Sequence, residues 1–226
     1  KKTFGGNTIT AIVKDNNSNI WCGSWDNALH LFDTLGNKKA SYIFNNQTEL
    51  NGESDEISCL TWIDQNHIWL GTKLGELMEF DTQTKKFKKL NARNLKTSRV
   101  LSLFFDSKQR VWIGMNNGMM VYDRYAQKFE IVNLPNDAEN NSLIAYCFFQ
   151  LNDSTLWIGT SNGIVQETNG KQILVPVLYK NKLQAVHSII RDGKDRIIIG
   201  TQGSLLILDQ KDFSVSTLRK MYIHSL

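Results

Sequence analysis

Cysteine and histidine are the side chains in this sequence that most readily carry nucleophilic, acid–base or metal chemistry. They stand far apart, at Cys22, Cys59, Cys147, His30, His67, His187 and His224. None of them has metal-ligand spacing, and the sequence holds neither a His-Glu-x-x-His motif nor a phosphate-binding loop. These side chains therefore predict no catalytic residue, no metal site and no cofactor in this chain.

Trp25 and Asp26 are the candidate ligand-binding residues, because they depart from the pattern of an otherwise polar turn. The corresponding turns elsewhere in the chain read Lys73-Leu74, Asn116-Asn117 and Ser161-Asn162. An aromatic ring beside a carboxylate can hold a sugar by stacking and by hydrogen bonds to its hydroxyls. The alternative is that Trp25 packs against a neighbouring blade or domain. Trp62 is weaker as a candidate, since Phe105 and Phe149 occupy its position in other copies.

The elements that must position these residues come from an internal repeat. Four segments share a Trp-x-Gly core, and a fifth has isoleucine in place of tryptophan: Trp21 and Gly23, Trp69 and Gly71, Trp112 and Gly114, Trp157 and Gly159, and Ile198 and Gly200. The spacing of about 44 residues is typical of one propeller blade. We interpret these tryptophans and glycines as structural repeat positions, with the ring filling space between blades and the glycine permitting close backbone approach.

Each copy contains four short apolar runs separated by polar or glycine-containing turns. An aspartate opens the first turn in three copies, at Asp15, Asp106 and Asp192. No window has a sustained helical period, so each copy is predicted to form four antiparallel strands. The predicted repeats cover residues 9–56, 57–99, 100–143, 144–185 and 186–222.

The predicted fold is therefore all-β, a β-propeller of four-stranded antiparallel blades, because stacking buries sheet faces that one blade cannot bury alone. Residues 223–226 repeat the start of the fifth copy, as the first strand of a sixth. We interpret residues 1–226 as a partial propeller. A closed five-bladed ring with a duplicated strand is the alternative.

Composition narrows the function classes. The 226 residues carry a formal charge of +4, and their paired lysines fall in turns rather than on a basic face, so we predict no nucleic-acid partner. No apolar run is long enough to span a membrane, so this segment is predicted not to insert directly. Each of the three cysteines is flanked by apolar or aromatic residues in a strand-like run, which predicts buried free thiols.

Two segments resemble the two-component-regulator propeller repeat, which reads approximately V-x-S-[IL], an acidic turn, [IVL]-W-[IV]-G-T and a glycine turn. They are ISCLTWIDQNHIWLGTKLGELMEFDTQTKKF (57–87) and VLSLFFDSKQRVWIGMNNGMMVYDRYAQKF (100–129). The resemblance implies a seven-bladed ring in the periplasmic sensor region of a bacterial hybrid two-component receptor. It implies a response to carbohydrate fragments and a kinase domain outside this chain. Its motif residues are scaffold, and it assigns no ligand residue.

Three functions remain open. The first is a sensor segment whose partners are an oligosaccharide ligand, the remaining blades and neighbouring domains of the same receptor. The second is a propeller enzyme, a lyase or hydrolase acting on a polysaccharide, and the third is a pure protein-interaction scaffold. The repeats show no cluster of acidic, basic or histidine side chains at equivalent ends of several copies, which favours binding over catalysis. Uncovered faces on the end blades also predict a homodimer.

Overall fold

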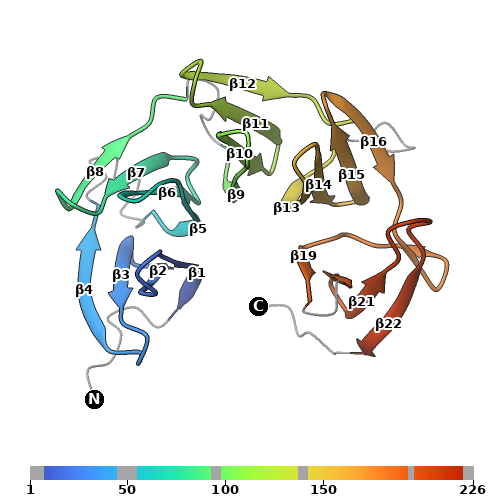
Figure 1. The fold of residues 1–226 in the computed structure, drawn as a ribbon, viewed down its shortest axis with the longest axis horizontal. Coiled ribbons are helices and arrows are strands. Elements are labelled where there is room, and N and C mark those ends of the chain that lie inside the picture. The colour runs from blue at the N-terminus through green and yellow to red at the C-terminus, as the bar shows by residue number, and fades with distance from the viewer. Residues whose placement is uncertain (1–7, 45–54, 93–97, 137–141, 193–195, 221–226) are drawn as a thin grey trace. The chain divides into compact units, whose positions relative to one another are not determined.

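The computed structural model describes residues 8–44, 55–92, 98–136, 142–192 and 196–220. The chain divides into two compact units, Lys1–Phe105 and Asp106–Leu226. The predicted strand at residues 223–226 lies outside the described residues. Strands and turns make up the described part of the chain, and Figure 1 traces them from blue to red along the sequence.

The sheet topology confirms the predicted all-β propeller fold. Among the described residues, five antiparallel sheets have four strands each, and in every one the strands lie side by side in chain order. This up-and-down order follows from short hairpin connections, which bring consecutive strands together.

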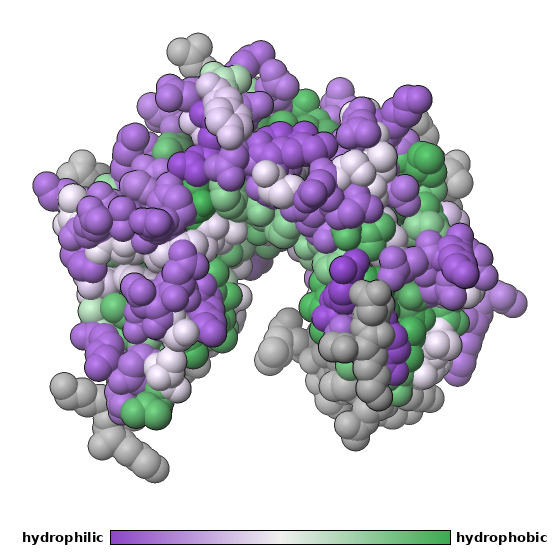
Figure 2. Space-filling view, in the orientation of Figure 1, coloured by the Kyte–Doolittle hydropathy of each residue, from purple (hydrophilic) through white to green (hydrophobic). Residues whose placement is uncertain are grey.

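The first unit contains blade 1, blade 2 and the opening strand of the third repeat. The strands of blade 1 are β1 (Ile9–Lys14), β2 (Ile20–Ser24), β3 (Ala28–Phe32) and β4 (Lys38–Ile43). Those of blade 2 are β5 (Ile57–Trp62), β6 (His67–Thr72), β7 (Leu77–Asp81) and β8 (Lys86–Lys89), and β9 (Val100–Phe105) follows. Figure 2 shows hydrophilic residues over much of the visible face of this unit, as expected for turns and outer strands in contact with water.

The second unit contains the rest of the third repeat and two further blades. The third repeat supplies β10 (Arg110–Met115), β11 (Gly118–Asp123) and β12 (Lys128–Val132). Blade 4 consists of β13 (Ala145–Asn152), β14 (Thr155–Thr160), β15 (Gly163–Thr168) and β16 (Lys171–Val175). Blade 5 consists of β19 (Ser188–Arg191), β20 (Ile197–Gly200), β21 (Ser204–Leu208) and β22 (Val215–Lys220).

A small hairpin precedes blade 5 and was not predicted from the sequence. It pairs β17 (Leu178–Tyr179) with β18 (Lys182–Leu183). Lys180 and Asn181 have φ of 51° and 59°, so both central turn residues are left-handed, as a tight hairpin requires. Its Tyr179 packs on the core between blades 4 and 5, and the Tyr179 hydroxyl accepts a hydrogen bond from Thr217 at 2.9 Å.

The blade tryptophans occupy the second strand of their repeats and are buried. Trp21, Trp69, Trp112 and Trp157 are 3%, 3%, 2% and 1% exposed. Trp21 lies 5.6 Å from Phe80 of blade 2, between ring centroids, and belongs to a cluster with Leu29, Ile57 and Phe80. Trp157 similarly joins a cluster with residues of blade 5, including Ile197 and Ile199. Burial of such large rings between blades is a main source of stability in this arrangement.

In three of these repeats the glycine two residues after the tryptophan lies where the next strand crosses. A Cβ added to Gly23 would lie 2.5 Å from Ile57 Cγ2 of blade 2, and one added to Gly71 would lie 2.4 Å from Val100 Cγ1 of β9. A Cβ on Gly159 would lie 2.6 Å from the carbonyl oxygen of Val186, just before blade 5. Glycine is therefore required at these positions by close packing of one blade on the next.

Candidate functional site

Trp25 and Asp26 form the turn between β2 and β3, at one end of blade 1. Asn27 completes this turn with a φ of 48°, a left-handed conformation that asparagine tolerates better than most residues. The backbone N–H of Trp25 donates to the carbonyl of Thr8 at 3.3 Å, which ties the turn to the residue before β1. The indole of Trp25 is 52% exposed, and Asp26 is partly buried. The structure thus presents an aromatic ring beside a carboxylate.

Asp26 is held by a polar network that continues into the blade. The Ser24 hydroxyl donates to the Asp26 carboxylate and lies 3.2 Å from Nε2 of His30. Nδ1 of His30 lies 2.9 Å from the hydroxyl of Ser41 on β4. Burial lowers the pKa of His30 below its usual value, a nearby lysine lowers it further, and Asp26 opposes both. The imidazole is therefore neutral at pH 7 and serves as a buried link between the two serines.

This serine, histidine and aspartate set does not have the geometry of a catalytic triad. In a triad the carboxylate binds the histidine nitrogen that faces away from the serine. Here Asp26 binds the serine itself, its carboxylate is 3.8 Å from Nε2 of His30, and Nδ1 faces Ser41. Ser24 is also 0% exposed, so no substrate carbonyl can reach its hydroxyl. The network positions Asp26 and supplies no nucleophile.

Residues 159–163 read Gly-Thr-Ser-Asn-Gly, which has the Gly-x-Ser-x-Gly spacing of a hydrolase nucleophile turn. That motif needs a strand followed by a helix, whereas these residues connect β14 to β15 in a hairpin. The Ser161 backbone and hydroxyl are hydrogen bonded to the backbone of Ile144, at 3.2 and 3.3 Å. The match is therefore a blade turn.

The cysteine thiols are protected by burial. Cys22 and Cys59 are buried and Cys147 is partly buried, all as free thiols. Burial raises the pKa of Cys59 and of Cys147 to about 12, and it also raises that of Cys22. Since the thiolate is the reactive form, these side chains act as small hydrophobes.

Trp62 lies on β5 and packs on the core between blades 1 and 2. Its ring centroid is 6.5 Å from that of Trp21. Packing is thus its first role, as its equivalence to Phe105 and Phe149 suggests.

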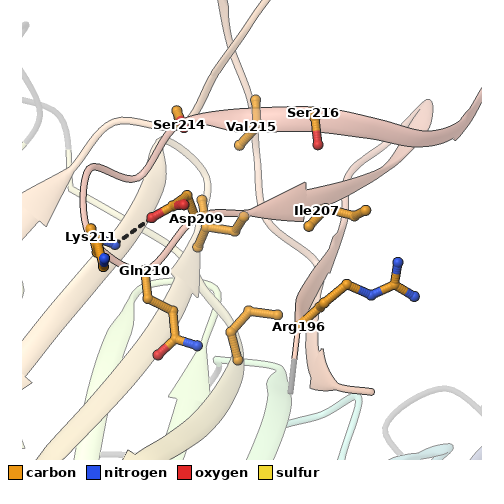
Figure 3. Close-up of a pocket in the computed structure, with 10 residues that line it drawn as sticks. Arg196, Ile207, Asp209, Gln210, Lys211, Ser214, Val215 and Ser216 are labelled. Carbon is orange, nitrogen blue, oxygen red and sulfur yellow. Dashed lines mark hydrogen bonds between the residues drawn. The ribbon is translucent and has the colours of Figure 1, made fainter. Parts of the chain in front are cut away.

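A cavity of about 650 Å³ lies against blade 5 (Figure 3). Ile207 of β21 and Val215 of β22 form part of its wall, and Arg196, Asp209 and Lys211 stand at its rim. Arg196 and Asp209 are already engaged, because Arg196 pairs with Asp192 and the Asp209 carboxylate accepts from the Lys211 backbone at 2.7 Å. All lining residues belong to one blade, so the cavity is a hollow over one sheet rather than a site on which several elements converge.

The described residues contain no cluster of three or more histidine, cysteine, aspartate or glutamate side chains placed to hold a metal ion. Nor is any helix in the described ranges long and apolar enough to cross a membrane.

Sequence reasoning proposed Trp25 and Asp26 as ligand-binding residues but did not connect them with Ser24, His30 and Ser41. His30 lies opposite Ser41 across the β3–β4 pairing. The contact between His30 and Ser41 depends on the register of β3 on β4, and that between Ser24 and His30 on the register of β2 on β3. The sequence carries a signal only for the second register, in the turn at residues 25–27.

Comparison with known proteins confirms the resemblance drawn from the repeat. Residues 3–26, which include the Trp25 turn, match the family model described as two component regulator propeller. Histidine kinase P4 of Formosa agariphila is 33% identical over 109 residues, which cover 45% of this chain and 8% of that protein. The chain therefore spans a small part of that relative.

Solved structures show the same fold. One is the extracellular domain of a protein of B. thetaiotaomicron assigned as a one component system, with a TM-score of 0.75 and 20% identity over 96% of this chain and 28% of that one. Another, from the same organism, is the extracellular domain of a protein assigned as a hybrid two component system. It has a TM-score of 0.74 and 18% identity over 98% of this chain and 31% of that one. At these identities the likeness establishes the fold alone.

Proposed function

We propose that this chain is a ligand-binding propeller segment from the periplasmic sensor region of a bacterial hybrid two-component receptor. Three observations support this: the family model over residues 3–26, the histidine kinase relative, and structural neighbours that are extracellular domains. In this proposal the chain itself is not an enzyme, and the kinase that receives the signal lies elsewhere in the receptor. The remaining blades and neighbouring domains of the receptor are its protein partners.

The ligand is a carbohydrate fragment that contacts Trp25 and Asp26. The observation that carries this assignment is the half-exposed indole of Trp25 beside a carboxylate held by Ser24. The indole face suits the apolar face of a pyranose ring, and the carboxylate can accept hydrogen bonds from two sugar hydroxyls. Because Ser24 and His30 fix Asp26 before binding, little side-chain entropy is lost when the ligand arrives.

The proposal is tested by isothermal titration calorimetry of the purified chain with maltohexaose, xylohexaose and mannohexaose. Replacing Trp25 with alanine removes the stacking surface, and a loss of 1–1.5 kcal/mol would weaken binding by about tenfold. Tyr125→Ala is the matched control, because Tyr125 is 82% exposed on a turn of the third repeat. Equal affinity in Trp25→Ala, or no binding of any of the three hexasaccharides, would contradict the proposal.

A further inference from the structure

A polar cleft of about 480 Å³ lies between blades 1 and 2, within the first unit. Three turns surround it: residues 15–19 between β1 and β2, residues 65–66 between β5 and β6, and residues 82–85 between β7 and β8. The first of these turns precedes β2, whereas Trp25 follows it, so the cleft and the Trp25 turn are at opposite ends of one strand. Its volume falls within the range of small-molecule sites, about 300–1,000 Å³.

Four primary amides line this cleft without being used by the fold. The side chains of Asn16, Asn17, Gln65 and Asn66 make no hydrogen bond to the described part of the protein. Each amide offers two N–H donors and a carbonyl acceptor. A sugar hydroxyl is likewise both donor and acceptor, so this set matches a polyhydroxylated ligand better than an apolar or purely anionic one.

The two charged groups of the cleft, Asp15 and Lys85, both contact the protein itself. The Asp15 carboxylate accepts hydrogen bonds from the backbone N–H groups of Asn17 and Asn19, from the Asn19 amide and from the Trp21 indole, at 2.8 to 3.1 Å. Burial raises the pKa of Asp15, but these bonds outweigh it and hold the pKa below its usual value. The Lys85 ammonium donates to the carbonyl of Thr82 and lies 5.8 Å from the centre of the Tyr42 ring. The Asp15 carboxylate is therefore fully engaged, whereas Lys85 keeps N–H donors from which a sugar hydroxyl can accept, beside the uncharged amides.

The cleft also contains an aromatic wall. Trp62 and Trp21 line it, and Trp62 is only partly buried. The indole N–H of Trp62 is buried and has no acceptor among the described residues. A ligand in the cleft therefore meets the accessible part of the Trp62 ring and not its N–H, and the ring offers a stacking surface.

We infer that this cleft is a second binding site, for a neutral sugar ring held by the amides of Asn16, Asn17, Gln65 and Asn66 against the indole of Trp62. The inference rests on the proposed carbohydrate-sensing function but assigns it a separate location from Trp25. A ligand here would contact blades 1 and 2 together, so its binding would strengthen their association. A ligand at the Trp25 turn would not depend on these amides.

The test is a nitrogen–proton correlation spectrum of the labelled full chain, titrated with maltohexaose, xylohexaose and mannohexaose. With one of these sugars, the side-chain amide signals of Asn16, Asn17, Gln65 and Asn66 should shift in a saturable manner. The Asn17→Ala, Gln65→Ala double variant should bind at this cleft about tenfold more weakly, the effect of losing roughly 1.4 kcal/mol. Gln202→Ala removes an exposed amide from a turn of blade 5 and is the matched control, with affinity unchanged.

The outcomes separate this inference from the proposed function. Shifts confined to the indole of Trp25 would overturn the cleft site and leave the carbohydrate sensor intact. Shifts at the four amides without any at Trp25 would support the cleft and overturn the Trp25 assignment. No shift at either place with all three sugars would overturn both. An equal loss of affinity in Gln202→Ala would also overturn the cleft site.

Discussion

Each blade tryptophan buries an indole N–H group that needs a hydrogen-bond acceptor. In two blades an aspartate in the preceding turn provides it. Asp15 accepts from Trp21 at 3.1 Å, and Asp106 accepts from Trp112 at 2.8 Å. In blade 2 the acceptor lies on a neighbouring strand instead, where Glu79 of β7 accepts from Trp69 at 2.9 Å. In blade 4 the indole N–H of Trp157 has no acceptor among the described residues. The turn before Trp157 is built on Asn152, which accepts from Ser154 and Thr155 instead, so blade 4 loses roughly 1–3 kcal/mol at this position.

His30 gives a pH-dependent prediction. Because its folded pKa lies below 6.5, the unfolded chain binds more protons as the pH falls, and stability is lost below pH 6.5. His187, whose pKa burial also lowers, contributes in the same direction. Urea unfolding at pH 7.5 and pH 5 should therefore show a smaller loss of unfolding free energy in His30→Gln than in the wild type. An equal loss in both would contradict a buried neutral His30.

At the scale of the blade, neighbouring blades are joined by hydrogen bonds to backbone carbonyls as well as by packed side chains. The hydroxyl of Thr10 on β1 is 3.1 Å from the Gly23 carbonyl and also bonds the Ile57 carbonyl of blade 2. The hydroxyl of Ser58 on β5 repeats this arrangement, at 3.1 Å from the Gly71 carbonyl and in contact with that of Val100 on β9. In both places the glycine lets the next strand come close enough for the hydroxyl to reach its carbonyl. The hydroxyl in turn provides a hydrogen bond at the point of close approach.

Gly71→Ala tests this close approach. The added Cβ would lie 2.4 Å from Val100 Cγ1 and 2.6 Å from Val100 Cβ, so β9 must move away. Overpacking of this kind costs about 1–3 kcal/mol of unfolding free energy, which urea denaturation can measure. Gly203→Ala is the control, because its Cβ would have no heavy atom within 4 Å. Equal stability of the two variants would show that blade packing does not need a glycine at position 71.

The blade pattern could be predicted from the sequence because its signals are local. Alternating apolar residues, Trp-x-Gly and polar turns each lie within one hairpin, so strands such as β6 and β10 follow from short windows. The β17–β18 hairpin could not, since two-residue strands have no detectable period. The contact of His30 with Ser41, and the meeting of Asn17 with Gln65 at one cleft, need the register of several strands. Trp25 could be proposed from the sequence because it departs from the repeat, and its role in ligand binding stays a prediction.

At the scale of the whole molecule, one row of side chains is buried in blade 4 by the blade that follows, whereas the equivalent row of blade 5 is exposed. In blade 4 the row through Trp157 lies against blade 5, and Trp157 is 1% exposed. Counting from the repeat, the equivalent row of blade 5 is Ile190, Ile198 and Ile207, paired side by side across β19, β20 and β21. Ile190 is 56% exposed, and Ile198 and Ile207 are partly exposed. An apolar row of this kind favours association with another surface.

We therefore predict that the purified 25.8 kDa chain self-associates through the Ile190 row of blade 5. Light scattering should give a mass above that of one chain, rising with concentration, and Ile190→Asp should return it to the monomer because a carboxylate cannot be buried there without a partner. Ile173→Asp is the control, since Ile173 is 61% exposed on the outer strand of blade 4. A monomer at every concentration would contradict the prediction and favour the closed five-bladed alternative. An equal effect of Ile173→Asp would place the association elsewhere, because Ile173 lies on the outer strand of blade 4 and not in the Ile190 row.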